Sequence, residues 1–268
     1  MTNSPESAGA AAMVLDIGTG RPLPPITERR SYAEPFGRTS FTMVTRAGRE
    51  MAVSLSAQPV FDLARSTAVA RRIRRSLRNG VAGGAPGLIR HALEAADFKR
   101  IDLQTLKSGL ELLRLAPNES GVIPAFWRTV APSAGHFALL CQDLRGQTEG
   151  GALLVEVVGN VDHAPEEALQ AAMPSFESGG LGMMLHIAPD LGAARRMAQL
   201  RPQCLAIDFA GVEHETARGW QSAAQLIGAA RLACPQVLLL NLRPDRGLAA
   251  ETAGATHAVF ADMQAVTV

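Results

Sequence analysis

Beyond residue 120 the sequence alternates between short, continuously apolar runs and longer stretches with helical character. The apolar runs predict β-strands at residues 121–126, 152–158, 182–187, 204–209, 237–242 and 256–260. The stretches between them predict helices at residues 134–144, 165–176, 191–199, 216–233 and 244–253. Apolar strands separated by helices are typical of a parallel sheet that is covered on both faces. The pattern therefore indicates an α/β fold, either a closed barrel or an open doubly wound sheet.

The N-terminal part of the chain is less regular. Residues 1–40 are rich in Ser, Gly, Ala and Pro, so we expect a disordered tail there and a folded domain over residues 41–268. Residues 51–61 predict a strand. Residues 67–77 predict a helix, because Val69, Ile73 and Leu77 recur every fourth position. A glycine-rich segment at residues 80–87 ends this helix, and helical periodicity returns over residues 88–115.

Composition and charge narrow the range of partners. The net charge of +1 gives no general attraction to nucleic acid or to a membrane surface, so neither is expected as a partner. Cys141, Cys204 and Cys234 lie far apart, which predicts three buried thiols and neither a disulfide nor a zinc site. No apolar segment is long enough to span a bilayer and no secretory signal is visible, so we expect a cytoplasmic location.

One segment carries a strong local charge. Arg71, Arg72, Arg74 and Arg75 fall within the predicted helix at residues 67–77, with no acidic residue between them. On a helix most of these arginines would face outward, either as a solvated surface or as a docking site for an acidic partner, phosphate groups or RNA. The segment lacks aromatic residues for base stacking, which counts against nucleic acid.

The chemistry of a parallel α/β fold is concentrated where its strands end. Three acidic residues, Glu156, Asp190 and Asp208, follow or end predicted strands and could converge on one mouth. Two-metal hydrolysis requires more carboxylates than these. The sequence also contains no phosphate-binding loop, no nucleophile elbow and no metalloprotease motif. We therefore predict no catalytic residue, no metal and no cofactor.

The order of these strand ends resembles the EAL domain family, the cyclic-di-GMP phosphodiesterases of bacteria, over residues 51–266. Residues 58–63 (QPVFDL) resemble the family's opening QPI-x-D-L strand, and residues 153–157 (LLVEV) resemble its LxxEITE strand. Residues 190–192 (DLG) are similar to the end of the DDFG motif, and residues 205–208 (LAID) to the KID strand. The resemblance implies an EAL-type modified TIM (β/α)8 barrel with an antiparallel first strand. It also implies ligand-binding positions at Gln58, Pro59, Glu156, Asp190 and Asp208.

The sequence departs from the family pattern where catalysis would need it most. The glutamate of the EAL triplet is expected near Thr67 or Ala68, and no acidic residue stands there. Pro189 stands for the first aspartate of DDFG, and Ala206 for the KID lysine. The metal-binding asparagine is replaced around residues 124–125, and the AEGVE glutamate is missing from residues 240–243.

These departures leave three hypotheses. The first is a catalytically inactive EAL-like domain that acts as a protein-interaction or regulatory module in bacterial signalling, with an unidentified protein partner. The second is a receptor that binds cyclic di-GMP without hydrolysing it. The third is an active phosphodiesterase with altered metal ligands, which the small number of carboxylates disfavours. The sequence does not identify the partner or the oligomeric state.

Overall fold

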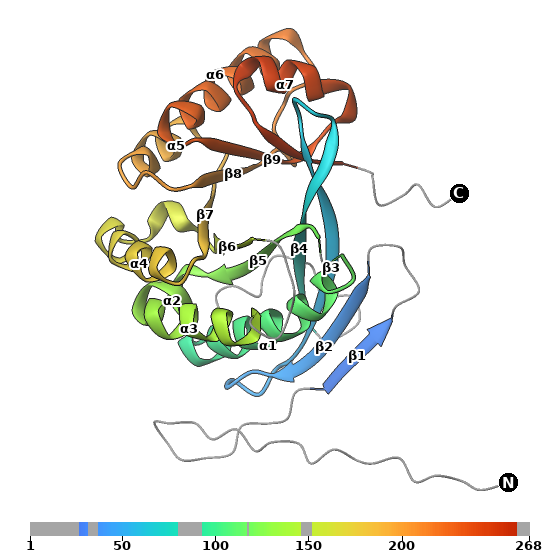
Figure 1. Cartoon of the computed structure of the whole chain (residues 1–268), viewed down its shortest axis with the longest axis vertical. Helices are drawn as coiled ribbons and strands as arrows, with labels where there is room; N and C mark the ends of the chain where they lie inside the picture. The colour runs from blue at the N-terminus through green and yellow to red at the C-terminus, as the bar shows by residue number, and fades with distance from the viewer. Residues whose placement is uncertain (1–26, 32–36, 80–92, 117, 146–151, 262–268) are drawn as a thin grey trace, which may run out of the picture.

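The computed structural model describes residues 27–31, 37–79, 93–116, 118–145 and 152–261. Its dominant feature is a closed barrel with helices packed around the outside (Figure 1). The strands are β1 (Thr27–Ser31), β2 (Arg38–Val44), β3 (Glu50–Asp62), β4 (Thr67–Asn79), β5 (Ser120–Phe126), β6 (Leu153–Val158), β7 (Gly182–Ile187), β8 (Cys204–Asp208), β9 (Gln236–Leu242) and β10 (His257–Phe260). The α-helices are α1 (Ala95–Leu113), α2 (Trp127–Val130), α3 (Ala134–Arg145), α4 (Glu166–Ser178), α5 (Leu191–Ala198), α6 (Ala217–Ala233) and α7 (Gly247–Ala253).

The barrel closes through an antiparallel strand. Strands β4 to β10 pair in sequence order and run parallel to one another. Strand β3 pairs antiparallel with β4 on one side and antiparallel with β10 on the other. The barrel with an antiparallel first strand, expected from the resemblance, is confirmed, and the open doubly wound sheet is excluded.

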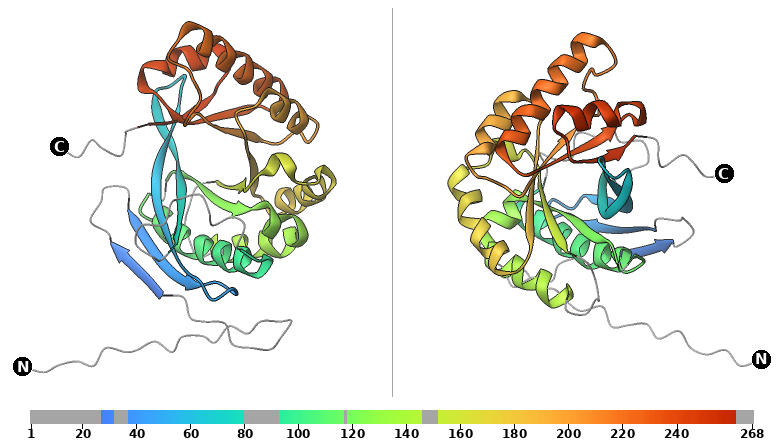
Figure 2. Two further views of the ribbon diagram at one scale, coloured as in Figure 1. Left: turned by 180° about the vertical axis from the view of Figure 1, so that it is seen from behind. Right: turned by 45° about the horizontal axis from the view of Figure 1, so that its top comes forward.

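Outside the barrel, β1 and β2 extend the sheet from the N-terminal half of β3. Strand β2 pairs antiparallel with residues Glu50–Ser56 of β3, and β1 pairs antiparallel with β2. Figure 2 shows these strands beside the barrel wall, away from the layer formed by α5, α6 and α7. Within the tail expected over residues 1–40, the structure describes Thr27–Ser31 as β1 and the start of β2 from Arg38, while residues 1–26 and 32–36 lie outside the described residues.

The apolar residues form two buried clusters, one inside the barrel and one between the barrel and its helices. The inner cluster is built mostly from small and aliphatic side chains: Val60, Ala70, Val122, Met184, Cys204, Ala206, Leu238, Leu240 and Val259. The outer cluster packs larger residues such as Phe41, Phe98 and Phe176 under the helices. Because both faces of β5 to β9 are buried, their sequences are continuously apolar, which is why the pattern predicted them.

The predicted helix at residues 67–77 is wrong, because these residues form β4. Strand β4 follows the turn after β3 and pairs with it along its whole length, from Asp62 opposite Thr67 to Met51 opposite Asn79. The apolar residues four positions apart suggested a helix, but the side chains of this segment alternate every two residues between the faces of a strand. Ala70 and Arg72 are buried toward the barrel interior, and Ile73 packs on the outer face beside Gly109 of α1. Long-range pairing with β3 outweighs the local helical pattern.

Most of the other predicted elements are confirmed within a few residues. The glycine-rich segment 80–87 and the start of the predicted helix 88–115 lie outside the described residues, and α1 accounts for the rest of that helix. Cys141, Cys204 and Cys234 are free and buried, as predicted. Among the helices that the structure describes, none has the length and apolar character needed to cross a membrane.

Candidate functional site

A cleft of about 460 Å³ opens at the mouth of the barrel, where the parallel strands end. It is lined by residues within β4 and by residues at or after the ends of β5, β6, β7 and β8, among them Arg75, Phe126, Asp162, His186 and Asp208. This is the position at which barrels of alternating strands and helices place their ligands.

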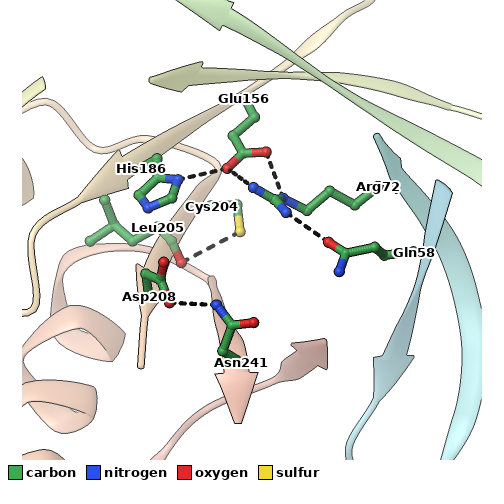
Figure 3. A network of polar contacts seen from close by, with 8 residues as sticks. All are labelled: Gln58, Arg72, Glu156, His186, Cys204, Leu205, Asp208 and Asn241. Atoms are coloured by element: carbon green, nitrogen blue, oxygen red, sulfur yellow. Dashed lines mark hydrogen bonds and ion pairs between the residues drawn. The ribbon is translucent and has the colours of Figure 1, made fainter. Parts of the chain in front are cut away.

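The floor of the cleft is an ion pair inside the barrel. Arg72 of β4 donates from Nε to Oε2 of Glu156 at 2.7 Å and from Nη2 to Oε1 at 2.8 Å, and Glu156 comes from β6. The third nitrogen of Arg72, Nη1, donates to Oε1 of Gln58 on β3 at 3.0 Å. Figure 3 shows Arg72 reaching between Glu156 and Gln58. The two side chains of the pair are 10% and 0% exposed, so a bidentate pair is buried where the barrel would otherwise be apolar.

His186 of β7 completes the contacts of Glu156. Its Nδ1 lies 2.8 Å from Oε1 of Glu156, and its side chain is 25% exposed on the cleft side. Burial alone would raise the pKa of Glu156, but the guanidinium of Arg72 and the contact with His186 outweigh burial and lower the pKa from 4.5 to about 2. Glu156 is therefore a carboxylate at any physiological pH, and both of its oxygens are occupied.

Asp208 and Asn241 form a second polar pair on the neighbouring side of the mouth. The Nδ2 of Asn241 donates to Oδ1 of Asp208 at 2.7 Å, and the backbone N–H of Ala210 donates to the same oxygen at 2.8 Å. Asn241 has a φ of 55°, in the left-handed region that asparagine tolerates better than most residues. Figure 3 shows this pair beside the Arg72–Glu156 pair.

The remaining residues of the implied ligand-binding set lie elsewhere. Asp190 caps the N-terminus of α5, where its Oδ2 accepts the backbone N–H of Ala193 at 2.7 Å. Pro59 is half-buried in β3 and faces Arg71 across the strand pair. The structure thus brings Gln58, Glu156 and Asp208 to the barrel mouth and leaves Asp190 in the role of a helix cap.

The arginines proposed for partner docking are divided between the two faces of β4. Arg71 makes a bidentate pair with Glu119, and Arg72 is buried against Glu156. Arg75 pairs with Asp102 of α1 at 2.6 Å, and its guanidinium lies 4.1 Å from the centre of the Phe126 ring. Arg74 is the exposed one of the four.

Sequence reasoning missed the partners of these residues. His186 was visible as a single histidine in an apolar strand, which is a signal for a buried polar contact. Asp102 was visible as an acidic residue within an otherwise amphipathic helix, and it is fully buried. No sequence pattern indicated that Arg72 would meet Glu156, because the two residues are 84 positions apart.

Comparisons with known proteins place this barrel among EAL domains in fold. No protein-family profile and no curated protein matches the sequence. Among solved structures, the chain is similar to a standalone EAL protein from Vibrio cholerae bound to c-di-GMP, with a TM-score of 0.60, 10% identity, and coverage of 77% of this chain and 88% of that one. It is also similar to the EAL domain of FimX from Xanthomonas citri in complex with c-di-GMP, with a TM-score of 0.58, 13% identity, and coverage of 78% and 85%.

A third solved structure is the Bacillus subtilis protein YkuI, with an EAL domain, in complex with its substrate c-di-GMP and calcium. The TM-score is 0.58 at 12% identity, and the match covers 76% of this chain and 53% of that one. The chain is therefore an α/β barrel of the modified TIM class. Within that class it has the fold of an EAL domain.

Proposed function

We propose that this chain is an EAL-fold domain that does not hydrolyse cyclic di-GMP and acts as a regulatory module in bacterial signalling through contacts with another protein. The proposal is carried by one observation, the bidentate pair between Arg72 and Glu156 at the floor of the cleft. Glu156 is the residue that the resemblance places in the family's LxxEITE strand.

The residues at the mouth do not fit a divalent cation. A metal ion at Glu156 would have to displace a guanidinium that binds both carboxylate oxygens, and it would then lie next to the positive charge of that group. Asp208 is 2.7 Å from the amide of Asn241, and Asp190 is held at a helix end. We therefore derive no hydrolytic step through a metal.

A hydrolysis assay tests this proposal directly. Purified protein incubated overnight with cyclic di-GMP and either Mg²⁺ or Mn²⁺ is expected to give no linear dinucleotide product by chromatography. Titration with Mn²⁺ under calorimetry is expected to show no binding heat above that of Glu156→Gln, the variant that removes the carboxylate. Product formation by the unmodified protein would refute the proposal.

The exposed position of Arg74 sharpens the test of a protein partner. Reversing charge at Arg71, Arg72 or Arg75 would break an internal ion pair. Weaker partner binding by those variants could then result from a destabilised fold and would not test the docking surface. Arg74→Glu changes an exposed side chain on the same strand, and thermal unfolding of this variant controls for any contact that Arg74 itself makes. Once a partner is identified, weakened binding by Arg74→Glu, with unchanged thermal unfolding, would support docking at β4. Unchanged binding would exclude that surface.

The receptor alternative is supported by a different observation, the cleft of about 460 Å³ at the mouth. This volume falls within the range of small-molecule sites, and the structurally similar proteins from V. cholerae and X. citri hold c-di-GMP. Calorimetric titration with cyclic di-GMP, with and without Mg²⁺, decides between the two. Micromolar or tighter binding would favour the receptor.

A further inference from the structure

Strands β2, β3 and β4 form an antiparallel sheet that extends beyond the barrel, and its two faces differ in character (Figure 1). One face is apolar and packs against α1, where Ile73 lies beside Gly109. The buried side chains of this face are Phe41, Met43, Met51, Val53, Leu55 and Ile73. Because side chains alternate along each strand, the residues between them belong to the opposite face.

Three rows of paired residues cross the sheet on this opposite face, and each row has one residue from β2, β3 and β4. The rows are Arg38 with Ser56 and Arg74, Ser40 with Ser54 and Ser76, and Thr42 with Ala52 and Arg78. The three arginines are exposed, and the other six residues are half-buried. We call these nine residues the arginine–serine face.

Every charged residue of the arginine–serine face is positive. The whole chain has 26 basic and 25 acidic residues, so a face with three arginines and no acidic residue departs from its average. The nearest acidic position on the same sheet is Glu50 at the start of β3, and the preceding Arg49, which is also exposed, offsets its charge. Such a surface attracts carboxylates or phosphates, and the hydroxyl groups between the arginines can donate hydrogen bonds to the same oxygens.

The other side chains of the face distinguish between classes of anionic partner. Sheets that bind single-stranded RNA stack the bases on aromatic side chains, and none of the nine residues is aromatic. Attachment to a membrane surface uses apolar side chains that enter the lipid. The exposed large apolar residues of the described chain all lie outside this face: Leu115, Leu139, Leu232 and Leu248. An acidic peptide requires neither feature.

We infer that the arginine–serine face docks an acidic peptide segment of a protein partner. The arginines bind its carboxylates, and the serine hydroxyls between them bind the same carboxylates or the peptide backbone. This inference rests on the proposed function, in which the domain acts through contacts with another protein, and it names the surface and the chemistry of that contact.

The spacing of the arginines fits an extended segment. Arg74 and Arg78 are four residues apart on one strand, which corresponds to about 13 Å, and Arg38 lies two strands from Arg74, or about 10 Å. In an extended peptide, glutamates at every second position lie on one side, and the first and third are about 13 Å apart. The docked segment would border the cleft, because Ser76 belongs both to this face and to the cleft lining.

The test follows backbone amide signals of the full ¹⁵N-labelled chain by NMR, at an ionic strength of about 0.01 M, where the Debye length is about 30 Å. The probes are acetyl-Gly-Glu-Gly-Glu-Gly-Glu-Gly-amide and its Lys counterpart. We expect the acidic peptide to shift the signals of Ser54, Ser56 and Ser76 at millimolar concentration or below, and the basic peptide to leave them unchanged. An ionic strength of about 1 M, where the Debye length is about 3 Å, should abolish the shifts.

Arg78→Glu is the main variant, because Arg38 and Arg74 also make contacts within the protein. It should weaken acidic-peptide binding about fivefold or more, and Arg74→Glu should have a similar effect. Arg218→Glu is the matched control, since it makes the same charge change at an exposed residue of α6, far from this sheet (Figure 2). Its binding is expected to equal that of the unmodified chain, and thermal unfolding of all three variants monitors the fold.

Two further probes represent the other anionic partners. They are a uridine tetranucleotide without terminal phosphates, which has the same number of negative charges as the acidic peptide, and vesicles containing phosphatidylglycerol. The inference is overturned if the acidic peptide does not bind, if the basic peptide binds equally well, or if Arg78→Glu binds as well as Arg218→Glu. Tighter binding of the tetranucleotide or the vesicles would also overturn it. The experiment contains no metal ion and measures no hydrolysis, so its failure is distinguishable from failure of the proposed function.

Discussion

Replacing Glu156 with glutamine removes one negative charge from the barrel interior and keeps the size of the side chain. In the folded protein the pKa of Glu156 is about 2, against an ordinary value of 4.5. A carboxyl group whose folded pKa is depressed stabilises the protein above its unfolded pKa, and this contribution is lost as the pH falls through the folded pKa. The shift corresponds to about 3 kcal/mol of stability at neutral pH.

The pH dependence gives a sharper test than the loss at neutral pH. At pH 3 the unfolded chain protonates this glutamate and the folded chain does not, so about 2 kcal/mol of the contribution is already gone. The stability difference between the unmodified chain and Glu156→Gln should therefore shrink from about 3 kcal/mol at pH 7 to about 1 kcal/mol at pH 3. Urea unfolding followed by the fluorescence of Trp127 and Trp220 measures both values.

Glu177→Gln serves as the control, because Glu177 is an exposed residue near the end of α4. Its effect on the free energy of unfolding should be small at both pH values. If the effect of Glu156→Gln were the same at pH 7 and pH 3, the carboxylate would not be held in its charged form by Arg72 and His186, and the reasoning about the ion pair would fail.

The remaining predictions concern the Arg72–Glu156 pair, the cap of α5 and the buried thiols. Arg72→Met leaves Glu156 buried without its counter-charge, and should lower the free energy of unfolding by about 3–5 kcal/mol. Arg72→Met combined with Glu156→Gln should recover part of this loss in a double-mutant cycle, and strict additivity would contradict the coupling. Asp190→Ala removes the cap of α5 and should lower the free energy of unfolding by about 1 kcal/mol. Any binding of cyclic di-GMP measured by calorimetry should be unchanged. Burial raises the pKa of Cys141 to about 12 and raises those of Cys204 and Cys234, so all three thiols should react with Ellman's reagent only after unfolding; rapid reaction of the folded chain would refute this.

The parts of the fold that sequence predicted are those where local pattern and tertiary environment agree. Strands β5 to β10 are apolar because helices or the barrel interior cover both of their faces, and Gly254 ends α7 in the left-handed conformation expected of a helix-terminal glycine. The helix predicted at β4 was wrong because the charges of its arginines are paired with acidic residues far away in the sequence. From the sequence alone, a segment rich in arginine is expected to be a solvated surface. Only the structure shows that Glu119, Glu156 and Asp102 lie beside these arginines and pair with them.

The sequence predicted three residues of the candidate site, namely Gln58, Glu156 and Asp208. Glu156 and Asp208 could be assigned to strand ends, because a parallel barrel collects these ends at one mouth. Their state could not be assigned, because it depends on residues from other strands that sequence does not bring together, namely Arg72, His186 and Asn241.

A buried carboxylate inside a barrel needs a positive charge, which either a bound metal ion or a protein side chain can supply. In this chain the charge is supplied by Arg72, which is covalently part of β4 and binds both oxygens of Glu156. A metal would also supply free coordination positions for water and substrate, whereas the guanidinium directs its remaining nitrogen to Gln58 and leaves none for a reacting group. Under the function proposed above, an arginine in place of a metal ion would neutralise the buried carboxylate without offering a site for water activation, so the fold would be kept without hydrolysis.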